Sequence, residues 1–348
     1  MSNGTPIRVC FYARLRDRGV LDRVEFYRQD LHALQQAGFD VVVATNWAEI
    51  PRDVDVFFIW WWTWAWQPLL AARLARRPAI VTGVFDYRWP EPGIDYVNRP
   101  FWQRLPMRAA LRVADANVFI AQCEIKQVTE ALPVTRPLCL PLGVDMTKYQ
   151  PGTEPRQPFV LSIGWLSAEN ARRKCMFEVV RAAAIVLARR PGLRFVIAGQ
   201  HHTGFPELQA LAAELGIADR VEWPGAVSEE EKIRLLQTCA VYVQPSVYEG
   251  FGLAILEALS CGAPVVSSPV GAVPEVVGDA GVLIDGRSPE QLAAAVQALL
   301  DDPADAAERG RRGRAHAVAS FAIERRQRAL AALVAELAQA RQARSSAR

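Results

Sequence analysis

The sequence has little of several features that mark particular classes of protein. It carries four histidines and a net charge of only +3 over 348 residues. A balance this close to neutral argues against nucleic acid as the partner. None of the six cysteines forms a C-x-x-C pair and several lie in apolar runs, so we expect reduced, mostly buried thiols. Together with an N-terminus that does not resemble a signal peptide, this predicts a cytoplasmic protein.

Candidate metal ligands are also scarce. His201 and His202 are adjacent in the sequence, but no Asp or Cys stands at ligand spacing from them. We therefore predict no metal site and no cofactor.

No apolar run has the features of a membrane span. The most apolar stretch, residues 56–72 (VFFIWWWTWAWQPLLAA), is short and contains Thr63, Gln67 and Pro68. Its tryptophans run through the middle, whereas a span would hold them at its ends. We predict a buried strand that leads through a loop into a helix. The tryptophans are then either core residues or an aromatic platform for sugar rings at the end of a strand.

What the sequence does contain is regular alternation of short apolar runs with longer amphipathic ones. IRVCFY, FDVVVAT, VDVFFIW, AIVTGVF and ANVFIA predict the first strands, with helices between most of them. The pattern pauses over the polar residues 149–159 and restarts with FVLSIGW, followed by a helix predicted over 174–190. This alternation is typical of an α/β fold with two doubly wound, Rossmann-like domains that face a cleft, and a ligand at the carboxyl ends of the strands.

The pause suggests the domain limits. We assign residues 1–150 to a first domain and 151–320 to a second. Residues 321–348 are expected to form a C-terminal helix that returns to the first domain and frays at its end.

One stretch, SVYEGFGLAILEALSCGAPVVSS (residues 246–268), combines a helix start with two glutamates. The glycines after Glu249 prevent a continuous helix, so we predict one that begins near Leu253 and stops at Gly262. Its first backbone N–H groups form a site for an anion such as a diphosphate. Glu257 lies about 6 Å further along the helix axis, where a carboxylate can accept hydrogen bonds from ribose hydroxyls. Glu249 would then face a group on the far phosphate, such as a sugar.

Spacing alone does not exclude a simpler interpretation, with Glu257 on an exposed helix face and Glu249 in a loop without function. The surrounding residues favour the ligand site. EGFGLAILEALSCGAPVVSS resembles the signature of the retaining GT-B glycosyltransferases of family 4, in which two glutamates with seven residues between them flank a Gly-Phe-Gly turn. FVLSIGWLSAENARRKC, RFVIAG, VEWPGAVSEEE and VGAVPEVVGDAGVLI resemble further segments of that family in the expected order. ADANVFIAQCEIKQ and LPLGVDMTKYQP resemble the end of its first domain, so the likeness extends over nearly the whole chain.

The resemblance implies transfer of a sugar from a UDP- or GDP-sugar to an acceptor, with retention of configuration and without a metal ion. The leaving diphosphate would take the acceptor's proton, so the protein need only stabilise the negative charge on that diphosphate. By this likeness Glu249 contacts the transferred sugar and Glu257 the ribose. The ARRK segment (residues 171–174) would bind the phosphates. Alternatively, this segment is a solvent-exposed turn without a ligand. The implied catalytic residues are Glu249, Lys174, Arg173 and Asp86, and the implied donor-binding residues are Glu257, Gly252, Leu253, Phe251, Gly19, Arg172, Gly225 and Ala226.

Two positions depart from the family pattern. Trp165 stands where the family often has an arginine, so Arg172 or Arg173 would have to compensate. Phe85 stands where the family often has a histidine, which leaves Asp86 to take part of its role. These departures keep open a sugar-nucleotide-binding protein without turnover. A sugar-nucleotide epimerase of the same fold is a further alternative, against which the long signature argues. A dehydrogenase is disfavoured because no G-x-G-x-x-G follows the first strand.

Acceptor contacts are expected from the first domain, from the aromatic run 60–66 and the loop 86–100. The predicted acceptor is a saccharide or a lipid-linked glycan, in the synthesis of a cell-surface or exported polysaccharide. The basic segment RLRDRGVLDR (14–23) is either a solvated helix face or a contact with an anionic ligand or acidic lipid headgroups. The last option predicts a peripheral protein on the inner face of the membrane.

Overall fold

The computed structural model describes residues 6–88 and 95–346, which fall into two compact units. The first domain comprises Met1–Gly143 and Ile323–Arg348, and the second comprises Val144–Ala322. The chain therefore enters the second domain at Val144 and leaves it at Ala322. Residues 149–159, where the sequence pattern pauses, belong to the second domain. Residues 89–94 of the predicted loop 86–100, and the last two residues of the predicted frayed end, lie outside the described residues.

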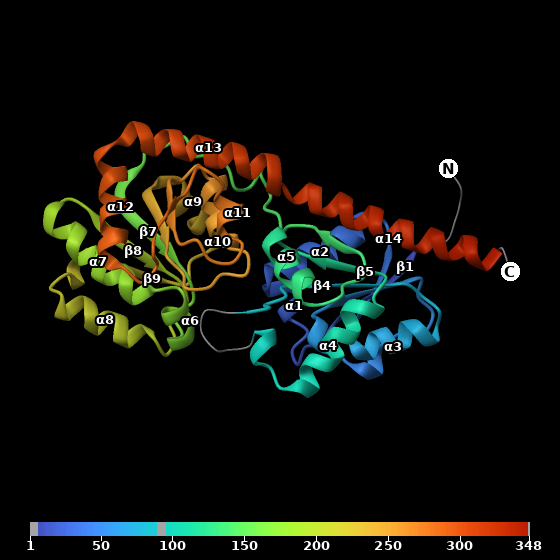
Figure 1. The fold of residues 1–348 in the computed structure, drawn as a ribbon. Coiled ribbons are helices and arrows are strands. Elements are labelled where there is room, and N and C mark those ends of the chain that lie inside the picture. The colour runs from blue at the N-terminus through green and yellow to red at the C-terminus, as the bar shows by residue number, and fades with distance from the viewer. Residues whose placement is uncertain (1–5, 89–94, 347–348) are drawn as a thin grey trace. The chain divides into compact units, whose positions relative to one another are not determined.

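The first domain is built on a parallel six-stranded sheet in the order β2-β1-β3-β4-β5-β6 (Figure 1). Its strands are β1 (Arg8–Ala13), β2 (Asp40–Ala44), β3 (Val56–Trp60), β4 (Ala79–Gly83), β5 (Ala116–Phe119) and β6 (Pro137–Cys139). Its helices are α1 (Val20–Arg23), α2 (Glu25–Gln36), α3 (Trp66–Leu74), α4 (Phe101–Val113), α5 (Gln122–Ala131) and α14 (Ile323–Ser346), with short 3₁₀ turns at Trp47–Glu49, Trp62–Trp64 and Tyr96–Asn98.

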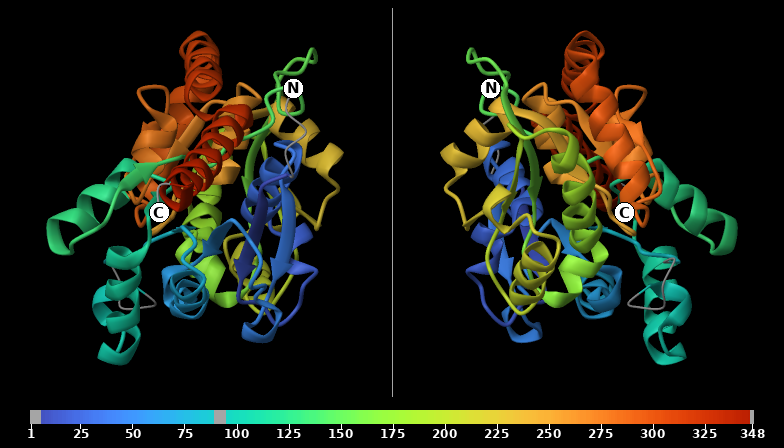
Figure 2. Two further views of the ribbon diagram at one scale, coloured as in Figure 1. Left: turned by 90° about the vertical axis from the view of Figure 1, so that its right-hand side faces the viewer. Right: turned by 90° about the vertical axis from the view of Figure 1, so that its left-hand side faces the viewer.

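Helices cover both faces of this sheet, so its central strands are apolar throughout rather than alternating. Phe57 and Ile59 of β3 pack with residues of α3, α4 and α5 on one face. Phe58 and Trp60 pack with residues of α2 and α14 on the other. The last helix of the chain thus completes the core of the first domain (Figures 1 and 2).

The second domain has another parallel six-stranded sheet, in the order β12-β11-β10-β7-β8-β9. Its strands are β7 (Gln157–Ile163), β8 (Arg194–Ala198), β9 (Val221–Gly225), β10 (Cys239–Gln244), β11 (Val265–Ser267) and β12 (Val282–Leu283). Its helices are α6 (Ala168–Arg173), α7 (Met176–Arg189), α8 (Phe205–Glu214), α9 (Glu229–Thr238), α10 (Leu253–Ser260), α11 (Val273–Val277), α12 (Pro289–Asp301) and α13 (Pro303–Phe321), with a 3₁₀ turn at Ala218–Arg220. One face packs against α7, α8 and α12. Helix α10 contacts β10 and β11, and it is itself in contact with α9, α11 and α13.

Two parallel sheets with helices on both faces confirm the predicted α/β class with two Rossmann-like domains. In each sheet the strand order reverses once, between β1 and β3 in the first domain and between β7 and β10 in the second. Loops that leave neighbouring strands in opposite directions open a crevice at such a point, at the carboxyl ends of the strands. The residues after these four strands are therefore the best placed to meet a ligand.

The predicted bounds of α10 are confirmed, but the helix predicted over 174–190 is wrong at its start. Helix α10 begins at Leu253, between Gly252 (φ +95°) and Gly262 (φ +71°), both in the left-handed region that glycine tolerates. The predicted helix is interrupted at Cys175, whose φ is positive (+51°). This residue separates α6 from α7. Lys174 consequently lies in a turn between two helices.

The stretch 56–72 forms β3, a 3₁₀ turn and most of α3, as the sequence predicts. Among the described residues, no helix has both the length and the apolar character needed to cross a membrane. Cys10, Cys175, Cys239 and Cys261 are buried, in agreement with the expected burial, while Cys123 and Cys139 are partly exposed.

Candidate functional site

Glu249 lies in the loop that follows β10, and its carboxylate meets two cations. Its Oε2 is 3.3 Å from Arg173 Nη1 and 3.7 Å from Lys174 Nζ. Gln244 Nε2 and Ser246 Oγ donate hydrogen bonds to the same oxygen over 2.9 and 3.3 Å. Burial raises the pKa of Glu249, but the charges of Lys174 and Arg173 outweigh it and hold the pKa below its ordinary value. Glu249 is thus an ionised carboxylate of fixed orientation.

The two cations follow β7, the neighbouring strand at the point where the strand order reverses. Arg173 Nη1 donates a 2.9 Å hydrogen bond to the Tyr248 carbonyl, and Val247 N–H donates to the Arg173 carbonyl over 2.8 Å. Lys174 packs its aliphatic stem on Gly164, where a Cβ would lie only 2.8 Å from Lys174 Cδ. Burial lowers the pKa of Lys174, and Glu249 opposes that shift only in part. The turn after β7 and the loop after β10 are therefore joined around one group of charges.

Glu257, which lies in the second turn of α10, belongs to a second group of charges. Its Oε1 accepts a 2.9 Å hydrogen bond from Lys232 Nζ of α9. Tyr149 donates a 2.7 Å hydrogen bond to Glu229, which also pairs with Lys148 at 2.8 Å. Burial raises the pKa of Glu257, and the nearby charge of Lys232 only partly offsets it. The side chain of Glu257 is only 12% exposed, so the interpretation of Glu257 as an exposed surface residue is wrong.

Sequence reasoning missed Lys232, Tyr149 and Glu229. Tyr149 lies at the start of the polar stretch 149–159, where the sequence pattern pauses, yet it is buried. Lys232 and Glu229 lie in the run EEEK of α9, which has the charge pattern of an ordinary exposed helix. The one available signal was their spacing of three residues, which places both on the same side of the helix.

The start of α10 carries backbone N–H groups that have no acceptor within the helix. Gly252 precedes the helix in a left-handed conformation. Phe251 is 5% exposed, and its ring packs edge-on against Phe321 with centroids 5.8 Å apart. Phe251, predicted to bind the donor, can therefore offer a ligand only its backbone. Gly271 was not predicted, but a Cβ there would lie 1.8 Å from the Glu249 carbonyl oxygen.

The remaining predicted residues of the second domain lie apart from these charges or contact other groups. Arg172 is exposed, and its nearest carboxylate is Glu207 at 4.0 Å. Gly225 (φ +73°) accepts a hydrogen bond from Gly199 N–H and lies beside His201, and Ala226 after it is exposed. The ring of His201 stacks on Phe205 at 3.6 Å. Across residues 6–88 and 95–346, no group of three or more His, Cys, Asp or Glu is arranged to hold a metal ion.

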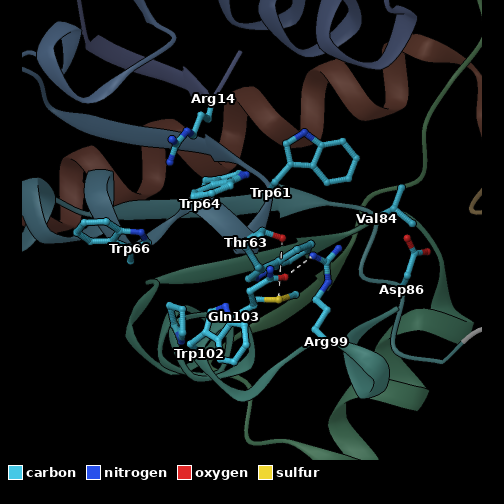
Figure 3. A pocket seen from close by; sticks show the side chains of 13 residues that line it. Arg14, Trp61, Thr63, Trp64, Trp66, Val84, Asp86, Arg99, Trp102 and Gln103 are labelled. Carbon is cyan, nitrogen blue, oxygen red and sulfur yellow. Dashed lines mark hydrogen bonds between the residues drawn. The ribbon is translucent and has the colours of Figure 1, made fainter. Parts of the chain in front are cut away.

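In the first domain, the residues after β1, β3 and β4 surround a cavity of about 580 Å³ (Figure 3). It is lined by Arg14, Trp61, Trp62, Thr63, Trp64, Trp66, Val84, Asp86, Arg99, Trp102, Gln103, Pro106 and Met107. The guanidinium of Arg14 lies 3.8 Å above the ring of Trp64. Asp86 and Arg99 lie toward the other side of the cavity in Figure 3. We call this cavity the aromatic pocket.

Both interpretations of the tryptophan run apply, but to different residues. Trp60 and Trp62 are 1% exposed, and Trp62 donates a 2.8 Å hydrogen bond to Asn117. Trp64 and Trp66 are 39% and 46% exposed and line the aromatic pocket. Trp61 has a positive φ of +77°, an unusual backbone conformation for a bulky residue and one that is common at functional sites.

In the first domain, the sequence also singles out Phe85, Asp86 and Gly19. Phe85 is buried against Trp62 and Phe119, so this position is part of the core, and the neighbouring Asp86 reaches the pocket instead. Gly19 precedes α1 with an ordinary φ of −62°, and its N–H donates to Asp17.

The basic segment after β1 is less uniformly positive than its sequence indicates. Arg23 pairs with Asp17, and Arg28 with Glu25. Arg14 points to the aromatic pocket.

The two sheets and the charged loops at the reversal of the second sheet define the GT-B class of fold. The crystal structure of Anabaena HepE in complex with UDP has a TM-score of 0.77 to this chain, covering 95% of this chain and 100% of that one at 18% identity. Sucrose-phosphate synthase from Thermosynechococcus elongatus has a TM-score of 0.73, covering 98% and 100% at 18% identity. At these identities the likeness concerns the fold alone.

Residues 147–316, which lie in the second domain, match the family model of glycosyl transferases group 1. D-inositol 3-phosphate glycosyltransferase from Thermobifida fusca is 34% identical over 177 residues, 46% of this chain and 41% of that protein. The enzyme of the same name from Thermobispora bispora is 42% identical over 135 residues, 36% and 32% of the two chains. The chain thus spans less than half of the length of these curated relatives.

Proposed function

We propose that this chain transfers a sugar from a UDP- or GDP-sugar to a saccharide or lipid-linked glycan, with retention of anomeric configuration. The observation that carries this proposal is the grouping of Glu249 with Arg173 and Lys174 beside the start of α10. A diphosphate needs positive charge and backbone N–H donors, and both are present there. The match of residues 147–316 to glycosyl transferases group 1 supports the same reaction class.

In this proposal each group of charges has a separate task. The α10 start, Arg173 and Lys174 bind the diphosphate, and Glu249 contacts the sugar. Glu257 accepts hydrogen bonds from the ribose hydroxyls. Lys232 holds one oxygen of that carboxylate at 2.9 Å and so fixes its orientation. HepE, which has this fold, has been crystallised with UDP and with UDP-glucose, so a protein of this fold can bind such a donor.

The chemical step breaks the bond between the anomeric carbon and the diphosphate oxygen. A bond from the acceptor oxygen to that carbon forms on the same face, and the acceptor's proton passes to the departing diphosphate. The negative charge that develops is stabilised by Lys174, Arg173 and the helix N–H groups, which are already in position before reaction. We propose that these cations supply the required charge without a metal ion.

We further propose that the acceptor binds in the aromatic pocket. Exposed indole rings offer flat apolar faces for a sugar ring, and Asp86 can accept hydrogen bonds from its hydroxyls. Arg14 and Arg99 suit an acidic or phosphorylated acceptor, a chemistry also present in the name of the D-inositol 3-phosphate glycosyltransferases. The setting would be synthesis of a cell-surface polysaccharide at the cytoplasmic side of a membrane.

A nucleotide-sugar-binding protein without turnover is the second candidate. The buried Phe85 favours it, because the family often has a histidine near the reacting carbon at this position.

A thermal-shift panel with UDP, GDP, ADP and their sugar conjugates, with and without magnesium, tests the donor site. A ligand at a hundred times its Kd adds about 2.7 kcal/mol of stability. We expect one base to stabilise the protein without magnesium, and Glu257→Gln to lose that shift. If no conjugate shifts the melting temperature, or if Glu257→Gln keeps the full shift, the proposed donor site is wrong.

A further inference from the structure

Helices α3 and α4 expose large apolar side chains that the fold of the first domain does not use. On α3, Trp66, Leu70 and Leu74 are 46%, 47% and 77% exposed. Their spacing of four residues places them on one side of the helix. On α4, Phe101 and Leu105 have the same spacing and are 69% and 66% exposed. Each helix therefore presents an apolar stripe to its surroundings.

The two helices that carry these stripes lie side by side and share the rim of the aromatic pocket. Helices α3 and α4 are in contact, and Arg73 of α3 donates a 2.6 Å hydrogen bond to the Val113 carbonyl at the end of α4. Trp66 and Trp102 line the same aromatic pocket (Figure 3). The ring of Phe101 packs edge-on against Trp102, with centroids 5.4 Å apart. We call this surface, which borders the pocket at Trp66 and Trp102, the α3–α4 face.

The charged residues of the two helices have a single sign. Helix α4 carries Arg104, Arg108 and Arg112, again four residues apart, and Arg73 lies in the last turn of α3. Neither WQPLLAARL nor FWQRLPMRAALRV contains an aspartate or glutamate. Tryptophan and phenylalanine side by side with leucine and arginine are typical of helices that lie in the headgroup region of a bilayer.

We propose that the α3–α4 face docks on an anionic lipid bilayer. The apolar stripes would enter the headgroup region while the arginines pair with lipid phosphates. A protein partner would need a matching acidic surface, whereas an anionic bilayer offers both the charge and the apolar layer at once. A lipid-linked acceptor could then keep its lipid in the bilayer and extend its saccharide into the aromatic pocket; this last consequence rests on the proposed function.

Co-sedimentation of the full chain with vesicles tests the docking. We expect binding to vesicles of phosphatidylcholine mixed with phosphatidylglycerol, weaker binding to phosphatidylcholine alone, and loss of binding as salt is raised. The double variant Phe101→Ser/Leu105→Ser should bind about tenfold more weakly or worse, because two apolar side chains no longer enter the bilayer. Arg104→Glu/Arg108→Glu should remove the preference for phosphatidylglycerol.

The matched control is Leu215→Ser/Val318→Ser, which removes two exposed apolar side chains of the second domain, 38% and 44% exposed. It should bind vesicles like the unaltered protein. The proposal is overturned if the unaltered protein ignores both kinds of vesicle, or if the α4 variants bind as it does. It is also overturned if light scattering shows a dimer that Phe101→Ser/Leu105→Ser separates, because a second copy would then cover the face.

The same samples separate this proposal from the donor site. The α4 variants should keep the thermal shift given by the nucleotide, which also shows that they are folded. Glu257→Gln should lose that shift but still bind vesicles. Failure of one test leaves the other proposal standing.

Discussion

Lys174 and Arg172 are two residues apart in the sequence, and the structure gives them different surroundings. The side chain of Lys174 is 12% exposed beside Glu249, whereas that of Arg172 is 69% exposed and faces α8. Both were candidates for the phosphate site. Only a cation held inside the site, with few waters to screen it, can act strongly on a leaving diphosphate.

We therefore expect Lys174→Met to lower kcat by about 100-fold or more, and Arg172→Met to change it little. Steady-state kinetics with the donor identified by the thermal-shift panel provides the measurement. An equal loss in both variants would mean that net charge, rather than the position of Lys174, matters.

Glu229 predicts a pH dependence of stability. Burial raises its pKa, but hydrogen bonds from Lys148 and Tyr149 outweigh this and lower the pKa to about 2, from an ordinary value of 4.5. A carboxyl group with a lowered pKa contributes stability that is present above its unfolded pKa and lost as the pH falls toward its folded pKa. Between about pH 4.5 and 2, the melting temperature of the unaltered protein should therefore fall more steeply than that of Glu229→Gln. If the melting temperatures of the two proteins fell in parallel, Glu229 would not have the lowered pKa that its contacts with Lys148 and Tyr149 indicate.

At the scale of elements, the loop before α10 depends on close approach of two backbone segments. Gly271 (φ +52°) leaves room for the Glu249 carbonyl, which a Cβ would meet at 1.8 Å. Gly216 (φ +69°) in the same domain has open space around it. Both glycines need a positive φ. A side chain at position 271 would displace the Glu249 carbonyl, whereas one at position 216 would displace nothing.

We expect Gly216→Ala to cost about 1 kcal/mol, the usual penalty for a left-handed alanine. Gly271→Ala should cost more, about 2–4 kcal/mol, and should also weaken nucleotide binding because the Glu249 loop must move. Chemical denaturation together with the nucleotide thermal shift measures both effects. If the two variants were equally stable and bound nucleotide equally, the close contact at Gly271 would not matter to the site.

The elements also show how far the sequence could be interpreted. Strands and the start of α10 followed from apolar runs and from glycines, because both are local signals. The break between α6 and α7 did not, since Cys175 adopts a positive φ that no local residue preference indicates. Glu249 was predicted from the residues next to it in the sequence. The pairing of Lys232 with Glu257 was not predicted, because these residues are 25 positions apart. Such pairs depend on tertiary packing and leave no pattern in a single sequence.

At the scale of the whole molecule, the chain returns to its first domain through α14. Arg326 of α14 pairs with Asp30 of α2 over 2.6 Å, and their side chains are 1% and 0% exposed. Leu330 and Val334 of the same helix are buried in the first core. Helix α14 consequently helps to stabilise the first domain, although the whole second domain separates the two in the sequence.

We expect Arg326→Ala to destabilise the protein by about 3–5 kcal/mol, because it leaves Asp30 buried without its partner. The exposed neighbour Arg325→Ala should stay within about 0.5 kcal/mol of the unaltered protein. Urea denaturation followed by tryptophan fluorescence reports mainly on the first domain, where the aromatic run lies. A small effect of Arg326→Ala would show that α14 is held by its apolar contacts alone.

The most direct test of the central claim is the configuration of the sugar that the purified chain releases from its donor. Proton NMR can follow slow hydrolysis of an α-linked nucleotide sugar without knowledge of the acceptor. The account predicts that the α-anomer appears first, before it equilibrates in solution, and that Lys174→Met slows its release. Initial release of the β-anomer would contradict the retaining mechanism. No release at saturating donor would contradict the transferase and favour the binding protein.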